Sequence, residues 1–286
     1  MVAQGQACLD EPVRELSPSA IVHEQAKREI SLLDLSTHHS GLPRLPSNMR
    51  PADPENPYAD FDAEKLLEFV VTYGTGKPEK PKFSYSNLGV GLLGFALANR
   101  GGKPFVELLR EQVLDPLGMS DTTVALTSEQ QMRFIQGHKT NGRPAHPWDL
   151  NSLVAAGGLR ASVSDVLRYL EALNDPQSVR DATGPGRYTL SQALEDVQKP
   201  RVKVDAALTM CLGWFYRPED QTHWHTGGTG GFTSYAAFSR PRKRAIVVLV
   251  NSAGGDTGSP AEVIGRYIGE RLDGRKAIWP GTAVCT

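Results

Sequence analysis

Residues 83–87, Phe-Ser-Tyr-Ser-Asn, carry two side chains whose types and spacing suit chemistry. Tyr85 and Asn87 are separated by one small residue, Ser86. A phenol can transfer a proton and a carboxamide can orient a substrate, because both groups donate and accept hydrogen bonds. Residues 88–97 then form an apolar run, so a second interpretation is a turn in which Asn87 only caps a helix.

Residues 225–232, His-Thr-Gly-Gly-Thr-Gly-Gly-Phe, are the second stretch of this kind. Four glycines at a strand end allow a ligand to lie against the backbone, where amide N–H groups are available. No Gly-Lys-Ser or Gly-Lys-Thr follows, which excludes a phosphate-binding loop. His223 and His225 share one face of the expected strand, but a third metal ligand at a suitable spacing is missing. We therefore expect neither a metal ion nor another cofactor.

Two other pairs of polar residues are expected to be structural. His38 and His39 are adjacent, so their side chains are not expected to face one site together. Ser84 and Ser86 have no base at a recognisable spacing, so neither is predicted to be a nucleophile.

Apolar spacing and capping residues predict the elements that position these side chains. Ser31, Asp62 and Ser162 are expected to cap helices, because each precedes a run with helical spacing. The expected helices begin near residues 31, 62, 87, 104, 162 and 260, and the last one ends at residue 272. The expected strands, mostly joined by hairpins, cover residues 210–216, 222–226, 232–238 and 245–251.

A helical part followed by an antiparallel sheet backed by a helix is an α+β arrangement. We expect a single domain over residues 1–286, built from two lobes. Residues 35–207 would form a mainly helical lobe, and residues 1–34 would join residues 208–286 in a sheet lobe. No internal repeat or low-complexity linker divides the chain.

The composition excludes several classes of function. The net charge of −1 gives no basic field for nucleic acid, and no apolar stretch is long enough to span a membrane. Residues 1–6 lack the features of a signal peptide, which leaves the localisation open between the cytoplasm and an exported location. Cys8, Cys211 and Cys285 are odd in number and scattered, so they predict neither a disulfide framework nor a zinc site.

The Tyr-Ser-Asn of residues 85–87 and the His-Thr-Gly of residues 225–227 together resemble the second and third motifs of the serine β-lactamase and penicillin-binding-protein family. The class C-like branch, with its D-alanyl-D-alanine peptidases and esterases, is the part of the family that the chain resembles. Residues 35–43 and 155–161 resemble two further shared segments. The resemblance implies a β-lactamase/transpeptidase-like fold and acyl transfer on a small β-lactam, D-Ala-D-Ala peptide or ester.

The family's first motif, Ser-x-x-Lys, supplies the nucleophilic serine and a neighbouring lysine. No serine among the 286 residues has a lysine three positions later. Residues 1–5, Met-Val-Ala-Gln-Gly, are typical of the last turn of a helix that closes on a glycine. The resemblance places the nucleophile helix there, so we expect this helix and the family's first strands to lie upstream of Met1.

The resemblance implies a role for each matching residue. Tyr85 would be the general base or proton relay, and Asn87 would orient the substrate amide. His225 stands where the third motif usually has a lysine, and the Gly228 N–H would be one oxyanion donor. The residues expected to bind substrate from the same strand are Thr226, Gly227 and Thr229.

The activation of Tyr85 is expected to be weak in this chain. A free phenol has a pKa near 10, and nearby cations must lower it before the group acts as a base. Both lysines that the family uses for this are absent, and His225 is neutral near pH 7. Histidine at this position also occurs in esterase- and peptidase-like members, so His225 does not exclude catalysis.

Residues 245–250, Ala-Ile-Val-Val-Leu-Val, have the composition of a strand that is covered on both faces and paired at both edges. In the family this strand lies beside the first strand, which this sequence lacks. An unpaired edge of this composition is a template for pairing. We therefore expect the chain to be poorly soluble, to form a homodimer through residues 245–251, or to rearrange.

Three functions remain open from the sequence. The first is an acyl-transfer hydrolase whose nucleophile segment lies outside this sequence. The second is a binding module that keeps the pocket without the chemistry, and the third is an assembly in which another polypeptide supplies the Ser-x-x-Lys helix. The shape of the pocket, which the motifs do not determine, selects among β-lactam, peptide and ester.

Overall fold

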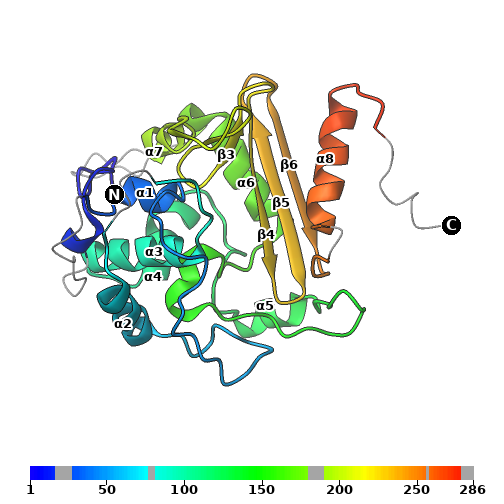
Figure 1. Ribbon diagram of the computed structural model, residues 1–286. Coiled ribbons are helices and arrows are strands. Elements are labelled where there is room, and N and C mark those ends of the chain that lie inside the picture. Colours follow the sequence, from blue (N-terminus) through cyan, green and yellow to red (C-terminus); the bar gives the residue numbers. More distant parts are fainter. Residues whose placement is uncertain (17–27, 77–80, 180–189, 256–257, 278–286) are drawn as a thin grey trace.

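The computed structural model describes residues 1–16, 28–76, 81–179, 190–255 and 258–277. An antiparallel sheet and its helices form one side of the molecule, and a group of short helices and loops forms the other (Figure 1). The α+β architecture expected from the sequence is therefore confirmed. No helix in the described ranges is both long enough and apolar enough to cross a membrane.

The sheet is an antiparallel meander in which each strand pairs with the next one along the chain. Its strands are β1 (Val202–Lys203), β2 (Thr209–Met210), β3 (Phe215–Arg217), β4 (Thr222–Thr229), β5 (Phe232–Ser239) and β6 (Arg244–Val250). The single strand expected over residues 210–216 is wrong, because β2 and β3 form a hairpin. Gly213 turns the chain with a φ of 77°, and the Cys211 N–H donates to Trp214 O at 2.8 Å.

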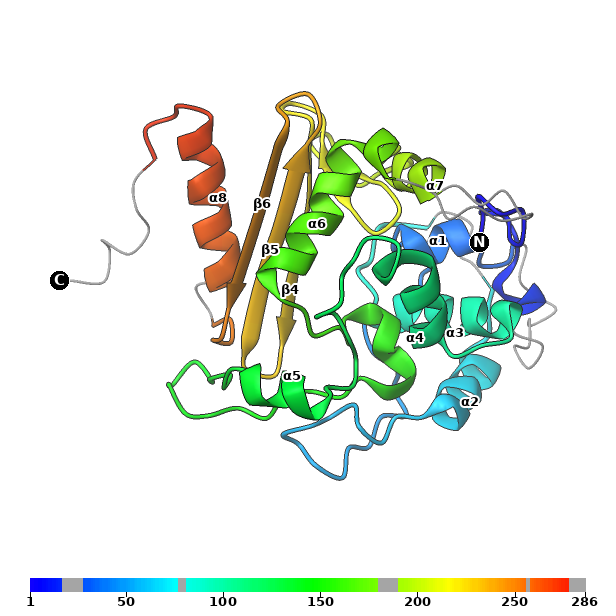
Figure 2. The same cartoon turned by 180° about the vertical axis from the view of Figure 1, so that it is seen from behind.

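Two helices cover opposite faces of β5 and β6, as Figures 1 and 2 show together. These helices are α6 (Val163–Asn174) and α8 (Pro260–Leu272). Alternation along the strands sends Phe238 toward α6, and Tyr235 and Ile246 toward α8. Within the described residues, β6 has one strand neighbour, β5, so its other edge is unpaired.

Short helices build the other side of the molecule. The remaining α-helices are α1 (Leu32–Ser36), α2 (Ala63–Tyr73), α3 (Asn87–Gly101), α4 (Phe105–Leu109), α5 (Ser128–Arg133) and α7 (Leu190–Asp196), of which α7 packs beside α6. Short helical segments of other types are η1 (Val13–Glu15), η2 (Arg110–Leu114), η3 (Asn151–Ala156) and η4 (Pro176–Ser178). The caps expected at Ser31, Asp62 and Ser162 are confirmed, since each side chain accepts a backbone N–H of the first helical turn.

Helix α3 packs closely against η3 because two of its glycines have no side chain. A Cβ atom at Gly91 would lie 2.4 Å from the Leu153 Cδ2 atom, and one at Gly94 would lie 2.3 Å from the Ala155 Cβ atom. Neither distance is compatible with a real side chain. Gly91 and Gly94 of the apolar run 88–97 are therefore explained by this contact, which holds α3 and the residues before it in place.

Residues 1–6 have the hydrogen bonds of a helix C-terminus. The Gly5 N–H donates to Val2 O at 2.9 Å, and the Gln6 N–H donates to Met1 O at 3.0 Å. Gly5 has a φ of 69°, in the left-handed region. These are the two hydrogen bonds and the glycine of a Schellman motif, which ends many helices.

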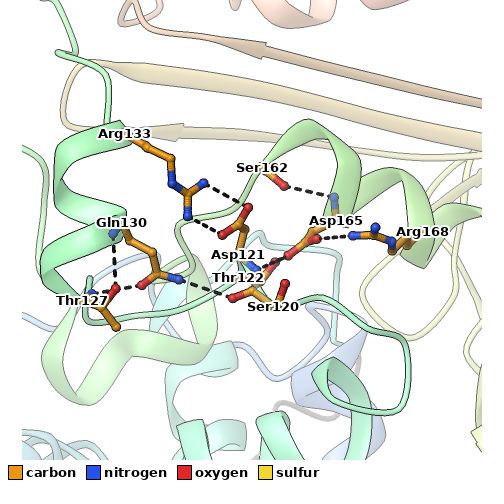
Figure 3. A network of polar contacts seen from close by, with 9 residues as sticks. All are labelled: Ser120, Asp121, Thr122, Thr127, Gln130, Arg133, Ser162, Asp165 and Arg168. Carbon is orange, nitrogen blue, oxygen red and sulfur yellow. Dashed lines mark hydrogen bonds and ion pairs between the residues drawn. The ribbon is translucent and has the colours of Figure 1, made fainter.

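A buried carboxylate ties the start of α6 to the loop before α5 (Figure 3). Asp165 is 1% exposed and accepts the Asp121 N–H at 2.8 Å and the Thr122 hydroxyl at 2.9 Å. Arg168 donates to its second oxygen at 2.8 Å. We expect Asp165→Ala to lower the free energy of unfolding by about 2–3 kcal/mol, because it leaves buried donors unpaired. Urea unfolding followed by circular dichroism measures this loss.

The matched control lies in the same network. Asp121 pairs with Arg133 through its side chain, but both partners are well exposed, at 36% and 51%. Asp121→Asn should therefore cost less than about 1 kcal/mol. An equal loss of unfolding free energy in Asp165→Ala and Asp121→Asn would contradict the larger contribution that we assign to the buried Asp165 carboxylate.

Candidate active site

The first turn of α3 fixes the position of Tyr85. Ser86 is the N-cap, since its hydroxyl accepts the Gly89 N–H at 2.8 Å and donates to Pro43 O at 2.7 Å. Asn87 is the first helical residue, so the interpretation of Asn87 as the cap is wrong. Ser86 is buried and both of its hydroxyl interactions are structural, which agrees with the expectation that it is not a nucleophile.

The Tyr85 ring lies among three potential cations. Its centroid is 4.2 Å from the His38 ring and 6.2 Å from the His225 ring, and the Arg44 guanidinium carbon lies 5.2 Å from it. Within the described part of the chain, the Tyr85 hydroxyl has no hydrogen-bond partner and is free to meet a ligand. Burial raises the pKa of Tyr85 above its usual value, and the Arg44 charge opposes this rise.

His38 joins the loop after α1 to the start of α3. The Ser86 N–H donates to His38 Nδ1 at 3.1 Å, and the Ser84 N–H donates to His38 O at 2.9 Å. Because Nδ1 accepts a hydrogen bond, the neutral ring carries its proton on Nε2. The rings of His38 and His39 both contact Phe83, at centroid distances of 6.0 and 5.8 Å, but their Nδ1 atoms have different partners, Ser86 N for His38 and Thr37 O for His39.

Protonation of the buried His38 ring should destabilise the fold in acid. Burial, with nearby cationic groups adding to it, lowers the pKa of His38 from 6.5 to about 4. Below pH 6.5 the unfolded chain binds a proton that the folded chain excludes, so stability falls until about pH 4. The full loss corresponds to about 3 kcal/mol. Burial also lowers the pKa values of His223 and His225, which act in the same direction.

His38→Asn isolates this contribution, because asparagine tolerates the positive φ of 57° and does not titrate. We expect the difference in free energy of unfolding between pH 7.5 and 4.5 to shrink by about 2–3 kcal/mol in the variant. Urea unfolding at the two pH values measures it. An unchanged difference would show that His38 does not control acid stability.

Strand β4 brings His225 to Tyr85. The His225 ring packs between the rings of Tyr85 and Phe215, at 6.2 and 5.8 Å, and burial lowers its pKa. His223 lies on the same face but has other contacts. Its Nε2 atom lies 2.9 Å from Gln198 O, and its ring stacks on Phe238. The two histidines therefore do not form a pair around a common ligand.

The four glycines expected to expose backbone have different surroundings. A Cβ at Gly227 would lie 2.4 Å from Ser234 Oγ, one at Gly230 2.2 Å from His146 O, and one at Gly231 2.7 Å from the Ala145 Cβ atom. Packing requires glycine at positions 230 and 231, where backbone atoms lie within 3 Å, whereas at Gly227 the close atom is the end of the Ser234 side chain. A Cβ at Gly228 would meet nothing within 4 Å, so open space adjoins the backbone there. Of the four glycines, Gly228 has open space beside it in the described structure, and the expectation that a ligand lies against this backbone stays a prediction.

Alternation along β4 separates the residues expected to bind substrate. Thr226 pairs in register with Tyr235, so its side chain lies on the face covered by α8. Gly227 and Thr229 share the opposite face with His225. Of Thr226, only the backbone is on the side of the strand that can serve the site.

Asn87 completes the arrangement at the start of α3. Its N–H donates to Arg44 O at 3.1 Å, and its side-chain amide has no hydrogen-bond partner within the described ranges. Tyr85 and Asn87 thus present a phenol and a carboxamide near His225. These groups can bind and orient a carbonyl compound and move a proton.

No group of three or more His, Cys, Asp or Glu side chains in the described residues is arranged to hold a metal ion. Cys8 is a free exposed thiol and Cys211 a free buried one, whose pKa burial raises to about 12. Cys285 lies outside the described residues.

Two neighbours of Tyr85 were missed by the sequence reasoning, Arg44 and the ring of His38. Both belong to the loop between α1 and α2, about forty residues before Tyr85 in the chain. The only available signal was the resemblance of residues 35–43 to a shared family segment, which gives no residue a place beside the phenol.

Comparisons with known proteins agree on one family. Residues 1–266 match the family model described as Beta-lactamase. The D-alanyl-D-alanine-carboxypeptidase/endopeptidase AmpH of Escherichia coli strain K12 is 30% identical over 265 residues, which are 88% of this chain and 66% of AmpH. A beta-lactamase of Pseudomonas fluorescens is 27% identical over 277 residues, 87% of this chain and 74% of that protein. The chain thus spans just under two thirds of the length of AmpH.

Solved structures are similar in fold. A beta-lactamase/D-alanine carboxypeptidase from Pseudomonas syringae has a TM-score of 0.74 at 22% identity, covering 97% of this chain and 80% of its own. An octameric penicillin-binding protein homologue from Pyrococcus abyssi has a TM-score of 0.74 at 23% identity, covering 96% and 62%. Both likenesses show a β-lactamase/transpeptidase-like fold.

Proposed function

The chain belongs to the beta-lactamase family, and we propose that it forms most of the active site of a serine-dependent acyl-transfer hydrolase. The proposed substrates are small compounds with a β-lactam, D-Ala-D-Ala peptide or ester bond, because the relatives are named as beta-lactamases and a carboxypeptidase. The observation that carries the proposal is that Tyr85, just before α3, and His225, in β4, lie side by side, with their ring centroids 6.2 Å apart. These are the residues of the second and third family motifs.

Each proposed role follows from the chemistry of the group. Tyr85 relays a proton between nucleophile and leaving group, and Asn87 holds the substrate amide. The Gly228 N–H stabilises the oxyanion that forms when the carbonyl is attacked. His225 is proposed to take the place of the third-motif lysine as a neutral hydrogen-bonding group. The backbone of residues 226–229 is proposed to bind the substrate alongside it.

The nucleophile in this proposal comes from residues outside this sequence, since no Ser-x-x-Lys occurs within it. The helix-ending turn of residues 1–6 supports a nucleophile helix directly before it. The coding DNA upstream of Met1 tests this source. An in-frame Ser-x-x-Lys would support one continuous enzyme, and its absence would favour a second polypeptide as donor.

A binding module without chemistry is the second candidate. It is favoured by the raised pKa of Tyr85, which makes the phenol a poor base at neutral pH. Hydrolysis of a chromogenic cephalosporin and of a nitrophenyl ester separates the two candidates when it is measured with the 286-residue chain alone and again with a Ser-x-x-Lys segment supplied. Turnover that disappears in Tyr85→Phe would contradict the binding module. Binding of both compounds without turnover, unchanged when a Ser-x-x-Lys segment is supplied, would contradict the hydrolase.

We further propose that the free edge of β6 pairs two copies of the chain. In the described ranges β6 has no strand neighbour at this edge, and the backbone groups there would gain hydrogen bonds if a second strand were added. Leu249→Lys should weaken this association by about tenfold or more, because two lysines would meet across the paired edges. Light scattering over a range of chain concentrations measures the effect.

Val263→Lys is the matched control, because Val263 on α8 is 37% exposed and Leu249 is 38% exposed. This control should leave association unchanged. A monodisperse monomer of the unaltered chain, with rapid hydrogen exchange along β6, would refute the homodimer.

A further inference from the structure

Arg44 is held firmly against the start of α3 by its backbone. Its carbonyl oxygen accepts the N–H groups of Asn87 and Leu88 at 3.1 and 3.2 Å. The preceding carbonyl, on Pro43, accepts the Ser86 hydroxyl at 2.7 Å. The root of the Arg44 side chain therefore has a fixed position relative to Tyr85.

The guanidinium group of Arg44 lies over the Tyr85 ring, 5.2 Å from its centroid, and the side chain is exposed. In the described ranges, Arg44 makes no ion pair. Some other arginines do make ion pairs, as Arg160 does with Asp149 and Arg217 with Asp220. Arg44 thus keeps a planar set of donors free beside the phenol.

Among the residues that the structure describes, Arg44 is the fixed charge beside the Tyr85 ring. The groups that shift the pKa of Tyr85 and His225 include Arg44 and no carboxylate. His38 and His225 are both neutral at pH 7, because burial lowers their pKa values. The site is therefore positive, and this favours an anionic ligand over a neutral one.

We propose that Arg44 binds the carboxylate of the substrate and makes the site selective for acyl compounds that carry a carboxylate next to the scissile bond. A guanidinium binds a carboxylate through two parallel hydrogen bonds, which fixes orientation as well as charge. Peptides with a free C-terminus and β-lactams with a ring carboxylate fit this requirement, and simple neutral esters do not. The inference rests on the proposed function of the same site.

The test compares two ligands that differ in one charge, N-acetyl-D-alanyl-D-alanine and its C-terminal amide. Their dissociation constants for the 286-residue chain are measured by titration calorimetry at low salt and pH 7.5. We expect the acid to bind about tenfold more tightly than the amide. Arg44→Gln should remove this preference and leave binding of the amide unchanged. Arg44→Lys should keep a preference of about threefold, since it retains the charge without the planar fork.

Arg50→Gln is the control from the same loop. Arg50 is exposed and donates to the carbonyl oxygens of Ser47 and Met49, so its loss should leave the preference intact. Equal binding of acid and amide by the unaltered chain, or a preference that survives in Arg44→Gln, would overturn the role of Arg44 and leave the proposed function standing. Failure of both ligands to bind any variant would overturn the proposed function and this inference together.

The pKa of Tyr85 gives a second readout that a purely structural arginine would not move. Arg44 lowers this pKa against the effect of burial. Arg44→Gln should therefore raise it further, while Arg50→Gln should not. Ultraviolet difference titration, with Tyr85→Phe identifying the signal, measures the change. An unchanged Tyr85 titration in Arg44→Gln would contradict the placement of the guanidinium charge at the site.

Discussion

Replacing Tyr85 with phenylalanine should lower kcat/KM by about 10²- to 10⁴-fold in the form of the protein that carries a Ser-x-x-Lys segment. The variant keeps the ring that packs on His38 and His225 and loses only the hydroxyl. Proton transfer between nucleophile and leaving group then lacks its relay. Initial rates with a chromogenic cephalosporin and a nitrophenyl ester measure the loss. The free energy of unfolding should change by less than about 0.5 kcal/mol, because the hydroxyl has no partner in the described structure.

Tyr58→Phe is the matched control for this substitution. Tyr58 is also a largely buried phenol whose pKa is raised by burial and opposed by Arg44, and its ring packs on Trp148. Tyr58 has no role in the proposed proton transfer. The kcat/KM of Tyr58→Phe should therefore stay within about threefold of that of the unaltered protein. An equal loss of kcat/KM in Tyr85→Phe and Tyr58→Phe would show that the Tyr85 hydroxyl does not relay a proton, and that both phenols affect the site only through packing.

The elements predicted best from the sequence are those whose signals are local. Helix α8 begins and ends at the expected residues, Pro260 and Leu272, because its apolar spacing is regular and Ser259 caps it. The later strands follow in the same way from apolar runs separated by tight turns. The hairpin at Gly213 was missed, since one glycine within an apolar run does not distinguish a turn from a continuous strand.

Only the residues that belong to the two motifs could be predicted as part of the candidate site. Tyr85, Asn87 and His225 are singled out by residue type and spacing. The contacts that define the environment of Tyr85 come from Arg44 and His38, and the hydrogen bond between His38 and Ser86 joins residues 48 positions apart. Loops carry no periodic signal, so such contacts depend on the folded arrangement and not on any local pattern.

The glycines of residues 227–231 also show how far a sequence pattern can predict a binding site. The sequence pattern of residues 227–231 suggested a backbone open to ligand throughout. Packing explains most of it, since Gly230 and Gly231 allow the β4–β5 turn to approach the loop of residues 145–148. A glycine that is needed for close contact and one that faces a ligand look identical in a sequence.

Phe238→Ala should lower the free energy of unfolding by about 3–5 kcal/mol, because it opens a cavity at the contact between the sheet and α6. Phe238 is 1% exposed, stacks on the His223 ring at 4.6 Å and meets the Trp214 ring edge-on at 5.2 Å. Phe238 therefore joins β5 to β4 and to the turn before β3, on the face of the sheet that also carries His225. Urea unfolding followed by tryptophan fluorescence and circular dichroism measures the loss, with an unchanged slope as the sign that only stability has altered.

Two controls separate the cavity from the loss of an aromatic ring. Phe238→Leu refills most of the volume and should cost less than about 1.5 kcal/mol. Tyr73→Ala removes a ring that is 50% exposed and stacks on Phe69, so it should cost less than about 1 kcal/mol. A loss in Phe238→Ala no greater than in these controls would show that α6 closes over the vacant space. In that case the face of the sheet below His225 would be adaptable, and the rigid support that we assign to the site would have to come from β4 alone.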